Sequence, residues 1–282
     1  YIEKEADINQ EIDRLRLATT ASLLTRDDVI VVASVSCIYN LGSPIEYGKN
    51  ILTLETSKPR HSGLSRIRLD SKVESRRIDP GGAQDDGGRK IINREQVMVR
   101  LIDLFYERSD FDFKRSTFRV RGNVIDVWPA YETNGLRLEF NENDIIKYIT
   151  KISPLTGEKI ESLEVYVLYP AKHYVSDRAT YEKVFGQIRH DLELRIKELR
   201  IMGKELEAHR LKQKTEFDLE TIKSLGYCSG IENYSRYFDG RKPGEPPFTL
   251  LEYFAQKKDW LLIIDESHIT VPQIRGMYNG DR

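Results

Sequence analysis

The sequence predicts an α/β chain in which an antiparallel β domain and a helical domain lie between two parts of a parallel sheet. Mainly aliphatic runs at Asp28–Ser36 and Leu261–Ile264 resemble strands that are buried on both faces. From Phe118 onward, apolar and charged residues alternate, as in antiparallel strands with one polar face. Between residues 176 and 225, apolar residues recur at helical spacing.

The amino-terminal part is predicted to form a helix over residues 9–24, followed by the strand at Asp28–Ser36 and a turn at 42–44. Residues 57–89 are polar, rich in Gly, Arg and Asp, and lack an apolar period. This composition predicts an inserted loop. Its arginines leave a polyanion-binding arm as the alternative.

The middle of the chain contains the signals of a separate β domain and of a helical domain. Gly122-Asn123 is a plausible two-residue hairpin turn between strands, and residues 136–140 continue the alternation. Two more strands are expected at 144–150 and 164–170. In the helical part, Gly203 permits a break and Gly226 predicts a carboxyl-terminal stop.

Charge and cysteine usage exclude several classes of protein. The 44 basic and 45 acidic residues nearly cancel, so no global field attracts a polyanion or a membrane surface. The longest apolar runs are far shorter than the roughly 20 residues that a membrane span needs. Cys37 and Cys228 have no metal-type spacing and indicate reduced thiols in a cytoplasmic protein.

Asp265 and Glu266 are the candidate catalytic pair. At the carboxyl end of a strand, an Asp can hold Mg²⁺ on nucleotide phosphates while a Glu polarises water, whereas the alternative is two exposed carboxylates. His268 lies beside them. The phosphate loop that such a site requires is absent, because the nearest match, Gly42–Asn50, has the wrong spacing and ends in Asn. No metal is expected on the protein alone.

Two further patterns, a set of arginines in the β domain and a loop-rich stretch after the helices, each allow a binding role or a purely structural one. Arg119, Arg121 and Arg137 should share one face of the β domain, where they could bind an acidic partner or could be balanced by Asp126 and Glu139. Residues 226–254 mix Tyr, Gly, Asn and Arg, which suits contacts with nucleic acid or simple packing around a turn.

Five long stretches of the chain closely resemble the UvrB family, which is part of the excinuclease ABC of bacterial nucleotide excision repair. They are YIEKEADINQEIDRLR, VIVVASVSCIYNLGSP, ERSDFDFKRSTFRVRGNVIDVWPA, GYCSGIENYSRY and LLIIDESHITVPQIRGMYNGDR. They occur in the family's order and cover nearly the whole chain apart from about 57–89. Asn40 stands where the family usually has Gly.

The resemblance implies an α/β fold that contains part of a RecA-like helicase motor domain. A mostly antiparallel β (α+β) partner-binding domain and a helical domain would be inserted in it. Residues 1–49 would belong to the first motor domain and begin on the returning strand of a DNA-verifying hairpin. Residues 50–172 would form the UvrA-binding domain, 173–247 the helical domain, and 248–282 the return to the motor. The chain would be an internal fragment.

The resemblance also implies roles for individual residues. Asp265 and Glu266 are implied for catalysis, Asp265 and His268 for ATP binding, and Asp265 for the Mg²⁺ that accompanies ATP. The residues implied for DNA binding are Tyr1, Glu3, Lys4, Tyr234 and Arg236. Those implied for binding UvrA are Arg108, Arg119, Arg121 and Arg137. Further partners are damaged DNA and, through segments outside this chain, UvrC.

ATP and Mg²⁺ are expected to serve only the full-length protein, because the phosphate loop and the second motor domain lie outside the chain. The 282 residues alone are therefore expected to have no ATPase activity. The alternative function is a non-catalytic UvrA-binding module, like the amino-terminal region of the transcription-repair coupling factor. The intact DESHITVPQ motif argues against it.

Overall fold

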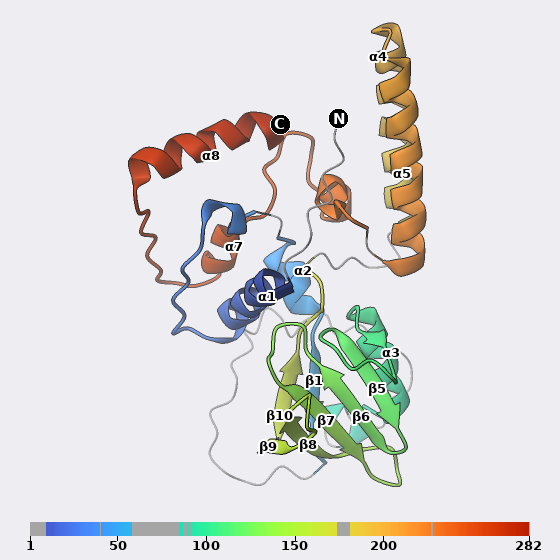
Figure 1. The fold of residues 1–282 in the computed structure, drawn as a ribbon, viewed down its shortest axis with the longest axis vertical. Helices are drawn as coiled ribbons and strands as arrows, with labels where there is room; N and C mark the ends of the chain where they lie inside the picture. Colours follow the sequence, from blue (N-terminus) through green and yellow to red (C-terminus); the bar gives the residue numbers. More distant parts are fainter. Residues whose placement is uncertain are drawn as a thin grey trace. The chain divides into compact units, whose positions relative to one another are not determined.

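The computed structural model describes residues 10–39, 41–57, 85–86, 89–90, 92–173, 181–226 and 228–281. The predictions for Tyr1, Glu3 and Lys4, for the turn at Asn40, and for most of 57–89 lie outside these residues. The chain divides into two compact units, which are considered separately (Figure 1). The first comprises Tyr1–Val32 and Pro44–His173, and the second Ala33–Ser43 and Tyr174–Arg282.

A six-stranded sheet with the order β4-β5-β6-β7-β8-β9 dominates the first unit. Its strands are β4 Glu107–Arg108, β5 Thr117–Arg121, β6 Val124–Trp128, β7 Gly135–Phe140, β8 Ile146–Ile152 and β9 Lys159–Leu163. The short β4 pairs with β5 in parallel, and every other pair is antiparallel. The predicted hairpin at Gly122-Asn123 is confirmed: Arg121 lies opposite Val124, and Gly122 has a φ of 57°.

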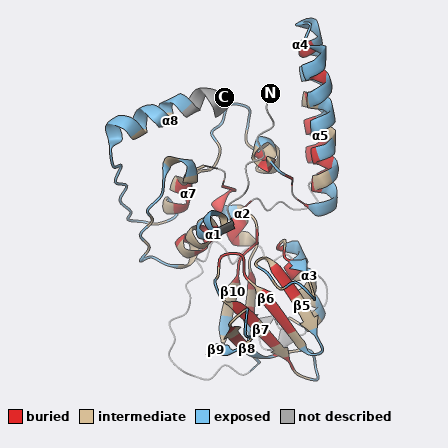
Figure 2. Ribbon diagram, in the orientation of Figure 1, coloured by how far each residue is buried: buried red, intermediate tan, exposed pale blue. Residues whose placement is uncertain are grey.

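One face of this sheet is buried. Ile125, Leu136 and Leu138 are at most 1% exposed, and they alternate with polar residues as a strand period of two requires. Figure 2 shows buried residues along β5, β6 and β7. Helix α3 (Arg94–Asp103) contributes the fully buried Val97 and Leu101. Its first turn is fixed by a capping box between Asn93 and Gln96.

The other described elements of the first unit are two helices and two two-stranded sheets. Helices α1 (Gln10–Thr25) and α2 (Pro44–Lys49) precede the six-stranded sheet in the chain, and α1 agrees with the helix predicted at 9–24. Strand β1 (Leu52–Glu55) pairs antiparallel with β10 (Val165–Leu168), and β2 (Asp85–Asp86) pairs with β3 (Arg89–Lys90). Arg115 forms an ion pair of 3.4 Å with Glu11, which joins α1 to the residues before β5.

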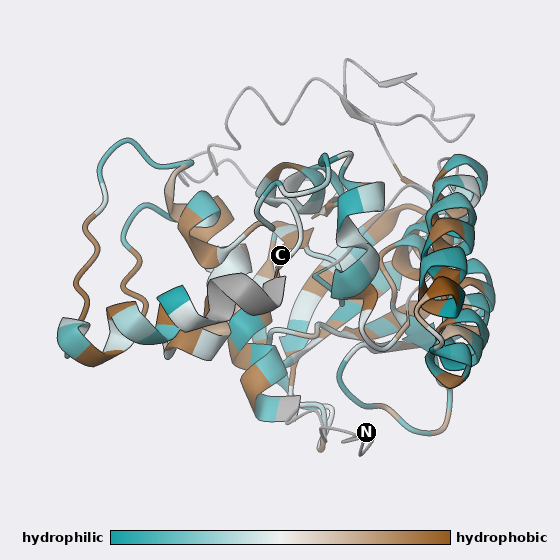
Figure 3. Cartoon of the chain, turned by 90° about the horizontal axis from the view of Figure 1, so that it is seen from above, coloured by the Kyte–Doolittle hydropathy of each residue, from teal (hydrophilic) through white to brown (hydrophobic). Residues whose placement is uncertain are grey.

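The second unit contains a hairpin of two long helices, α4 (Tyr181–Ile201) and α5 (Glu205–Leu225). Gly203 and Gly226 have φ values of 73° and 75°, which confirms the predicted break and stop. The paired helices at the right of Figure 3 carry hydrophobic residues between hydrophilic ones. The remaining elements are η1 Val35–Cys37, η3 Ile231–Tyr234, α6 Ser235–Phe238, α7 Leu250–Phe254 and α8 Ser267–Asp281.

The predicted parallel strands at Asp28–Ser36 and Leu261–Ile264 are wrong for this structure. The aliphatic residues of both segments lie outside any strand, and Ile30, Val32 and Leu261 are 93%, 97% and 82% exposed. A parallel strand forms only where neighbouring strands satisfy its backbone groups and cover both faces. No described strand pairs with either segment, so their β-type composition is not sufficient to make a sheet.

Candidate functional site

The polar face of the six-stranded sheet brings the predicted arginines together. The strand register places Asp126 between Arg119 on β5 and Arg137 on β7. Arg121 is two residues after Arg119 and therefore points to the same side. The prediction that these three arginines share one face is confirmed, because hairpin pairing and a strand period of two leave no other arrangement.

Asp126 is the centre of this face. Its side chain is only 3% exposed. Its Oδ2 accepts a hydrogen bond of 3.0 Å from Nε of Arg119, and its Oδ1 accepts one of 2.7 Å from Nε of Arg137. A second bond of 3.0 Å from Arg137 makes that pair bidentate. The buried negative charge is therefore compensated from both neighbouring strands.

Two of the arginines thus have an internal role. The side chains of Arg119 and Arg137 are 15% and 31% exposed. The guanidinium of Arg119 also lies 4.3 Å from the centre of the Phe113 ring. The hydrogen bond to Asp126 raises the pKa of Arg137. The sequence left open whether these arginines bind an acidic partner or are balanced by carboxylates of the same face. For Arg119 and Arg137, the structure shows that Asp126 balances their charge.

The other two arginines are more open to solvent. Arg121 is exposed and forms no ion pair with any described residue. Arg108 pairs with Asp110 at 3.0 Å, and its side chain is 55% exposed. The pKa of Asp110 is lowered by the hydrogen bond from the Val120 amide, then by Arg108, and also by the charge of Arg121. Arg108, Asp110 and Arg121 therefore form one cluster at the β5 edge of the sheet.

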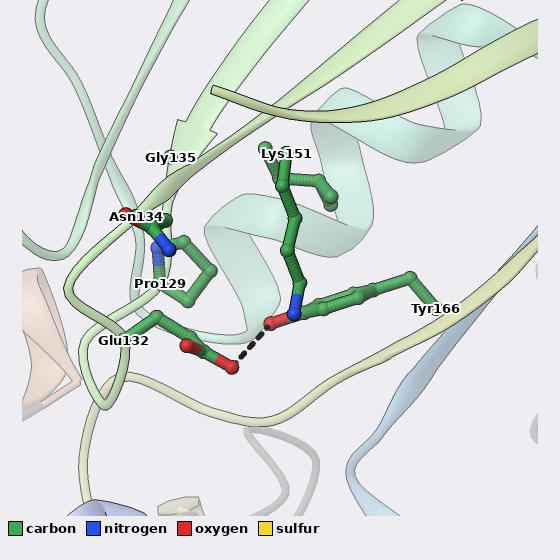
Figure 4. Close-up of a pocket in the computed structure, with 7 residues that line it drawn as sticks. Pro129, Glu132, Asn134, Gly135, Lys151 and Tyr166 are labelled. Atoms are coloured by element: carbon green, nitrogen blue, oxygen red, sulfur yellow. Dashed lines mark hydrogen bonds between the residues drawn. The ribbon is translucent and has the colours of Figure 1, made fainter. Parts of the chain in front are cut away.

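A shallow depression lies near the start of β7, lined in part by Glu132, Lys151 and Tyr166 (Figure 4). The Tyr166 hydroxyl donates to Glu132 at 3.5 Å and to the Tyr131 hydroxyl at 3.3 Å. Lys151 forms an ion pair of 3.7 Å with Glu161. Burial raises the pKa of Tyr166, which keeps its phenol protonated. The polar side chains of the depression are thus engaged with neighbouring residues, Tyr166 with Glu132 and Tyr131, and Lys151 with Glu161.

The second candidate site is the carboxylate pair before α8. The Glu266 amide donates to Oδ1 of Asp265 at 2.9 Å, and Nδ1 of His268 lies 3.3 Å from Oε2 of Glu266. Glu266 has a φ of 45°, a left-handed conformation that is uncommon for a residue with a side chain. The Thr270 hydroxyl also donates to the Asp265 carbonyl at 3.1 Å. The structure therefore brings together the three residues predicted for ATP.

Asp265, Glu266 and His268 do not form a metal-type cluster with other described residues. Mg²⁺ prefers six oxygen ligands, and no cluster of three His, Cys, Asp or Glu side chains with metal-binding geometry occurs among the described residues. Asp265, Glu266 and His268 are all exposed. Residues 44–49 of the segment Gly42–Asn50, the nearest sequence match to a phosphate loop, form the helix α2. No described helix is both long and apolar enough to cross a membrane.

Tyr234 and Arg236, predicted to contact DNA, are held by carboxylates of the helical hairpin. The Tyr234 hydroxyl donates at 2.8 Å to Asp218 of α5, whose side chain is 4% exposed. Arg236 donates at 2.6 Å to Asp191 of α4, and its guanidinium lies 4.0 Å from the centre of the Tyr237 ring. Burial raises the pKa of Tyr234. These side chains therefore fix the segment that follows α5 against both helices.

Comparison with known families accounts for the two domains just described. The sequence model of the UvrB interaction domain matches residues 88–174, and that of the UvrB third helical domain matches residues 179–240. Together these ranges cover just over half of the chain. The whole chain is 48% identical to UvrABC system protein B of Chloroflexus aggregans and spans 37% of that protein.

The chain belongs to the UvrB family. UvrABC system protein B of Caldanaerobacter subterraneus is 46% identical over the whole chain, which spans 38% of it, and that of Gemmatimonas aurantiaca is 46% identical, with 35% spanned. The chain thus corresponds to little more than a third of the length of these UvrB relatives. The UvrB interaction domain contains the sheet with Arg108, Arg119, Arg121 and Arg137, and the UvrB third helical domain contains Tyr234 and Arg236.

The sequence analysis named Asp126 as a possible balance for the arginines without placing it between two of them, and it missed Asp191 and Asp218 in these UvrB domains. Asp126 could have been placed between Arg119 and Arg137, because a two-residue turn at Gly122-Asn123 fixes the register of the hairpin. Asp191 and Asp218 gave no comparable signal. They lie in charged helices, and their partners are 45 and 16 residues away in the sequence.

Proposed function

We propose that this chain is part of the damage-verifying component of bacterial nucleotide excision repair. It binds UvrA through the polar face of its interaction domain, contacts damaged DNA, and acts in a protein that recruits UvrC through other segments. The arginine-rich face within the matched UvrB interaction domain is the observation that carries this proposal. The proposed location is the cytoplasm.

Charge and geometry support a protein partner for this face. Arg119, Arg121 and Arg137 outnumber Asp126 and Glu139 on it, so an acidic partner gains from contact. The carboxylates between the arginines disfavour a nucleic-acid backbone, whose phosphates would lie against them. Because Asp126 fixes two guanidinium groups before binding, little side-chain entropy is lost when a partner docks.

The nucleotide site is proposed for a complete UvrB protein. There, Asp265 would hold Mg²⁺ bound to ATP, Glu266 would orient water, and His268 would contribute to ATP binding, within a RecA-like motor. The pairing of His268 with Glu266 and the hydrogen bond to Asp265 support a preorganised cluster at the start of α8. The 282-residue chain alone is proposed to be inactive as an ATPase.

The experiment that tests the proposed partner is a titration of purified UvrA with the 282-residue chain. Arg121→Glu should weaken binding about tenfold or more, because it puts a negative charge against an acidic partner. Lys212→Glu, on an exposed position of α5, is the matched control and should bind like wild type. Equal affinity of all three proteins at low salt would refute the assignment of this face to UvrA.

A second experiment tests the motor. In a complete UvrB protein carrying these residues, Asp265→Ala should abolish ATP turnover and leave UvrA binding unchanged. Retained turnover would contradict the proposed role of the carboxylate. The alternative of a non-catalytic UvrA-binding module is disfavoured, because the similarity to UvrABC system protein B extends over the whole chain, including Asp265 and Glu266.

A further inference from the structure

Phe111 is the most exposed large hydrophobic residue of the described chain, at 103% of its reference area. It lies in the segment between β4 and β5, one residue after the Asp110 that pairs with Arg108. A single exposed apolar residue on a surface is common and by itself requires no explanation. Phe111 differs from such a residue because its backbone is held by hydrogen bonds and charged side chains lie near it.

Residues on both sides of Phe111 are held in place by hydrogen bonds. The Ser109 amide donates to the Phe118 carbonyl at 2.8 Å, and Oδ1 of Asp110 accepts from the Val120 amide at 3.1 Å. The Asp112 amide donates to the Ser109 hydroxyl at 3.3 Å. Phe111 is therefore presented by a hydrogen-bonded segment that runs along the edge of β5. Such a residue can bury its ring in a partner without first ordering its loop.

Phe113, two residues later, shows that the same segment can pack an aromatic side chain so that it is partly buried. Its ring lies 5.7 Å from that of Trp128 and under the guanidinium of Arg119. The fold therefore uses one phenylalanine for packing and leaves the other in solvent. Tyr148, on the same sheet face as Arg121 and 52% exposed, adds a second accessible aromatic group.

We propose that Phe111, with Arg108 and Arg121 beside it, is the apolar anchor of the surface that binds UvrA. This inference rests on the proposed function and refines it. Arg121 and Arg108 make the solvent-facing charged contacts, whereas Arg119 and Arg137 support the surface through Asp126. The complementary site on UvrA is an apolar pocket with carboxylates at its rim. Aromatic and arginine side chains at the centre of an interface supply most of its binding energy.

The decisive experiment measures the affinity of purified UvrA for variants of the 282-residue chain. Phe111→Ala should weaken binding about tenfold or more. Leu155→Ala is the matched control, because Leu155 is 93% exposed in the turn between β8 and β9, at the opposite edge of the sheet from β4 and β5, which carry Arg108 and Arg121. It should bind within about twofold of wild type. Thermal unfolding of both variants should match wild type, since neither side chain is buried.

The sign of a charge at the same position tests the chemistry of the partner. Phe111→Asp should bind UvrA more weakly than Phe111→Lys, because an acidic rim repels the first and attracts the second. Both variants lose the phenylalanine ring, so the difference between their affinities for UvrA reports the effect of the charge. If the two variants bind UvrA with equal affinity, or if Phe111→Asp binds more tightly, the proposal that the UvrA pocket has an acidic rim is refuted.

The outcomes separate this inference from the proposed function. If Arg121→Glu weakens UvrA binding and Phe111→Ala does not, the anchor is refuted and the partner assignment stands. If neither variant changes the affinity, both fail. A fluorescent DNA duplex is titrated in parallel. Loss of duplex binding by Phe111→Ala, with UvrA binding intact, would place Phe111 on a nucleic-acid surface and overturn the inference.

Discussion

The Tyr234 hydroxyl donates a hydrogen bond of 2.8 Å to the buried carboxylate of Asp218. Asp218 also accepts from Lys214 at 3.0 Å, within the same helix, so the tyrosine is the partner that comes from outside α5. This bond connects the segment after the hairpin to the hairpin itself. If the proposed DNA contact involves Tyr234, its ring and backbone would act while the hydroxyl remains occupied.

Tyr234→Phe should destabilise the second unit by about 1–3 kcal/mol, because a buried carboxylate loses a donor and cannot recover it from solvent. Urea unfolding followed by circular dichroism at the helical band measures the effect. Tyr148→Phe, at an exposed position of the sheet domain, is the control and should leave the unfolding midpoint unchanged. An unchanged midpoint for Tyr234→Phe would show that Lys214 alone satisfies Asp218.

Asp126→Asn should destabilise the interaction domain by about 3 kcal/mol, because removing one member of a buried ionic group leaves its partners uncompensated. Urea unfolding followed by tryptophan fluorescence, with Trp128 as the reporter in β6, measures it. Glu139→Gln on the same face is the control, since Glu139 forms no ion pair with a described residue. The control should change stability by less than about 0.5 kcal/mol. Equal losses in both variants would contradict the central role of Asp126.

His173 makes the stability of the first unit sensitive to pH. Burial, and then the charge of Arg16, lower its pKa from 6.5 to about 3, and neither ring nitrogen has a hydrogen-bond partner among the described residues. The folded protein holds the imidazole neutral, whereas the unfolded chain binds a proton below pH 6.5. The stabilising contribution is therefore complete above pH 6.5 and is lost progressively as the pH falls towards 3.

His173→Phe should remove this dependence. Between pH 6.5 and 5.5, wild type should lose about 1 kcal/mol more of its unfolding free energy than the variant, up to the limit of 1.36 kcal/mol per pH unit for one proton. Unfolding in urea at both pH values gives the comparison. His190→Phe, at an exposed position of α4, should retain the wild-type slope. A wild-type slope in His173→Phe would mean that other groups carry the dependence.

Gly186 and Gly203 form a matched pair for testing the backbone of the helical hairpin. An added Cβ meets no atom within 4 Å at either position, but only Gly203 has a positive φ, of 73°. Gly186→Ala should stabilise the hairpin by about 0.5–1 kcal/mol, because alanine favours the interior of a helix. Gly203→Ala should destabilise it by about 1 kcal/mol. Thermal unfolding of the two variants should thus shift in opposite directions, and a shift in the same direction would contradict this account.

Local patterns in the sequence predicted those parts of the fold in which neighbours in the chain are also partners. The turn at Gly122-Asn123, the break at Gly203 and the stop at Gly226 are examples, because each depends on a backbone conformation that glycine or asparagine adopts readily. The shared face of Arg119 and Arg121 followed from the strand period, and the register of the strand pairs adds Arg137 to it.

The errors arose where a segment depends on distant partners. The runs at 29–32 and 261–264 have the composition of buried parallel strands, but a strand also needs neighbours, and the described residues supply none. The exposure of the arginines could not be predicted either, because it depends on which of them reach Asp126. The bonds of Tyr234 and Arg236 required the packing of the whole hairpin.

The exposed aliphatic runs have a practical consequence for anyone who purifies this chain. Ile30, Val32, Leu261 and Ile263 are each at least 80% exposed in segments rich in residues with high β-propensity. Unpaired segments of this kind associate with copies of themselves and can seed aggregates. The chain should therefore be most prone to precipitate near its isoelectric point of about 6.6, where charge repulsion between molecules is weakest.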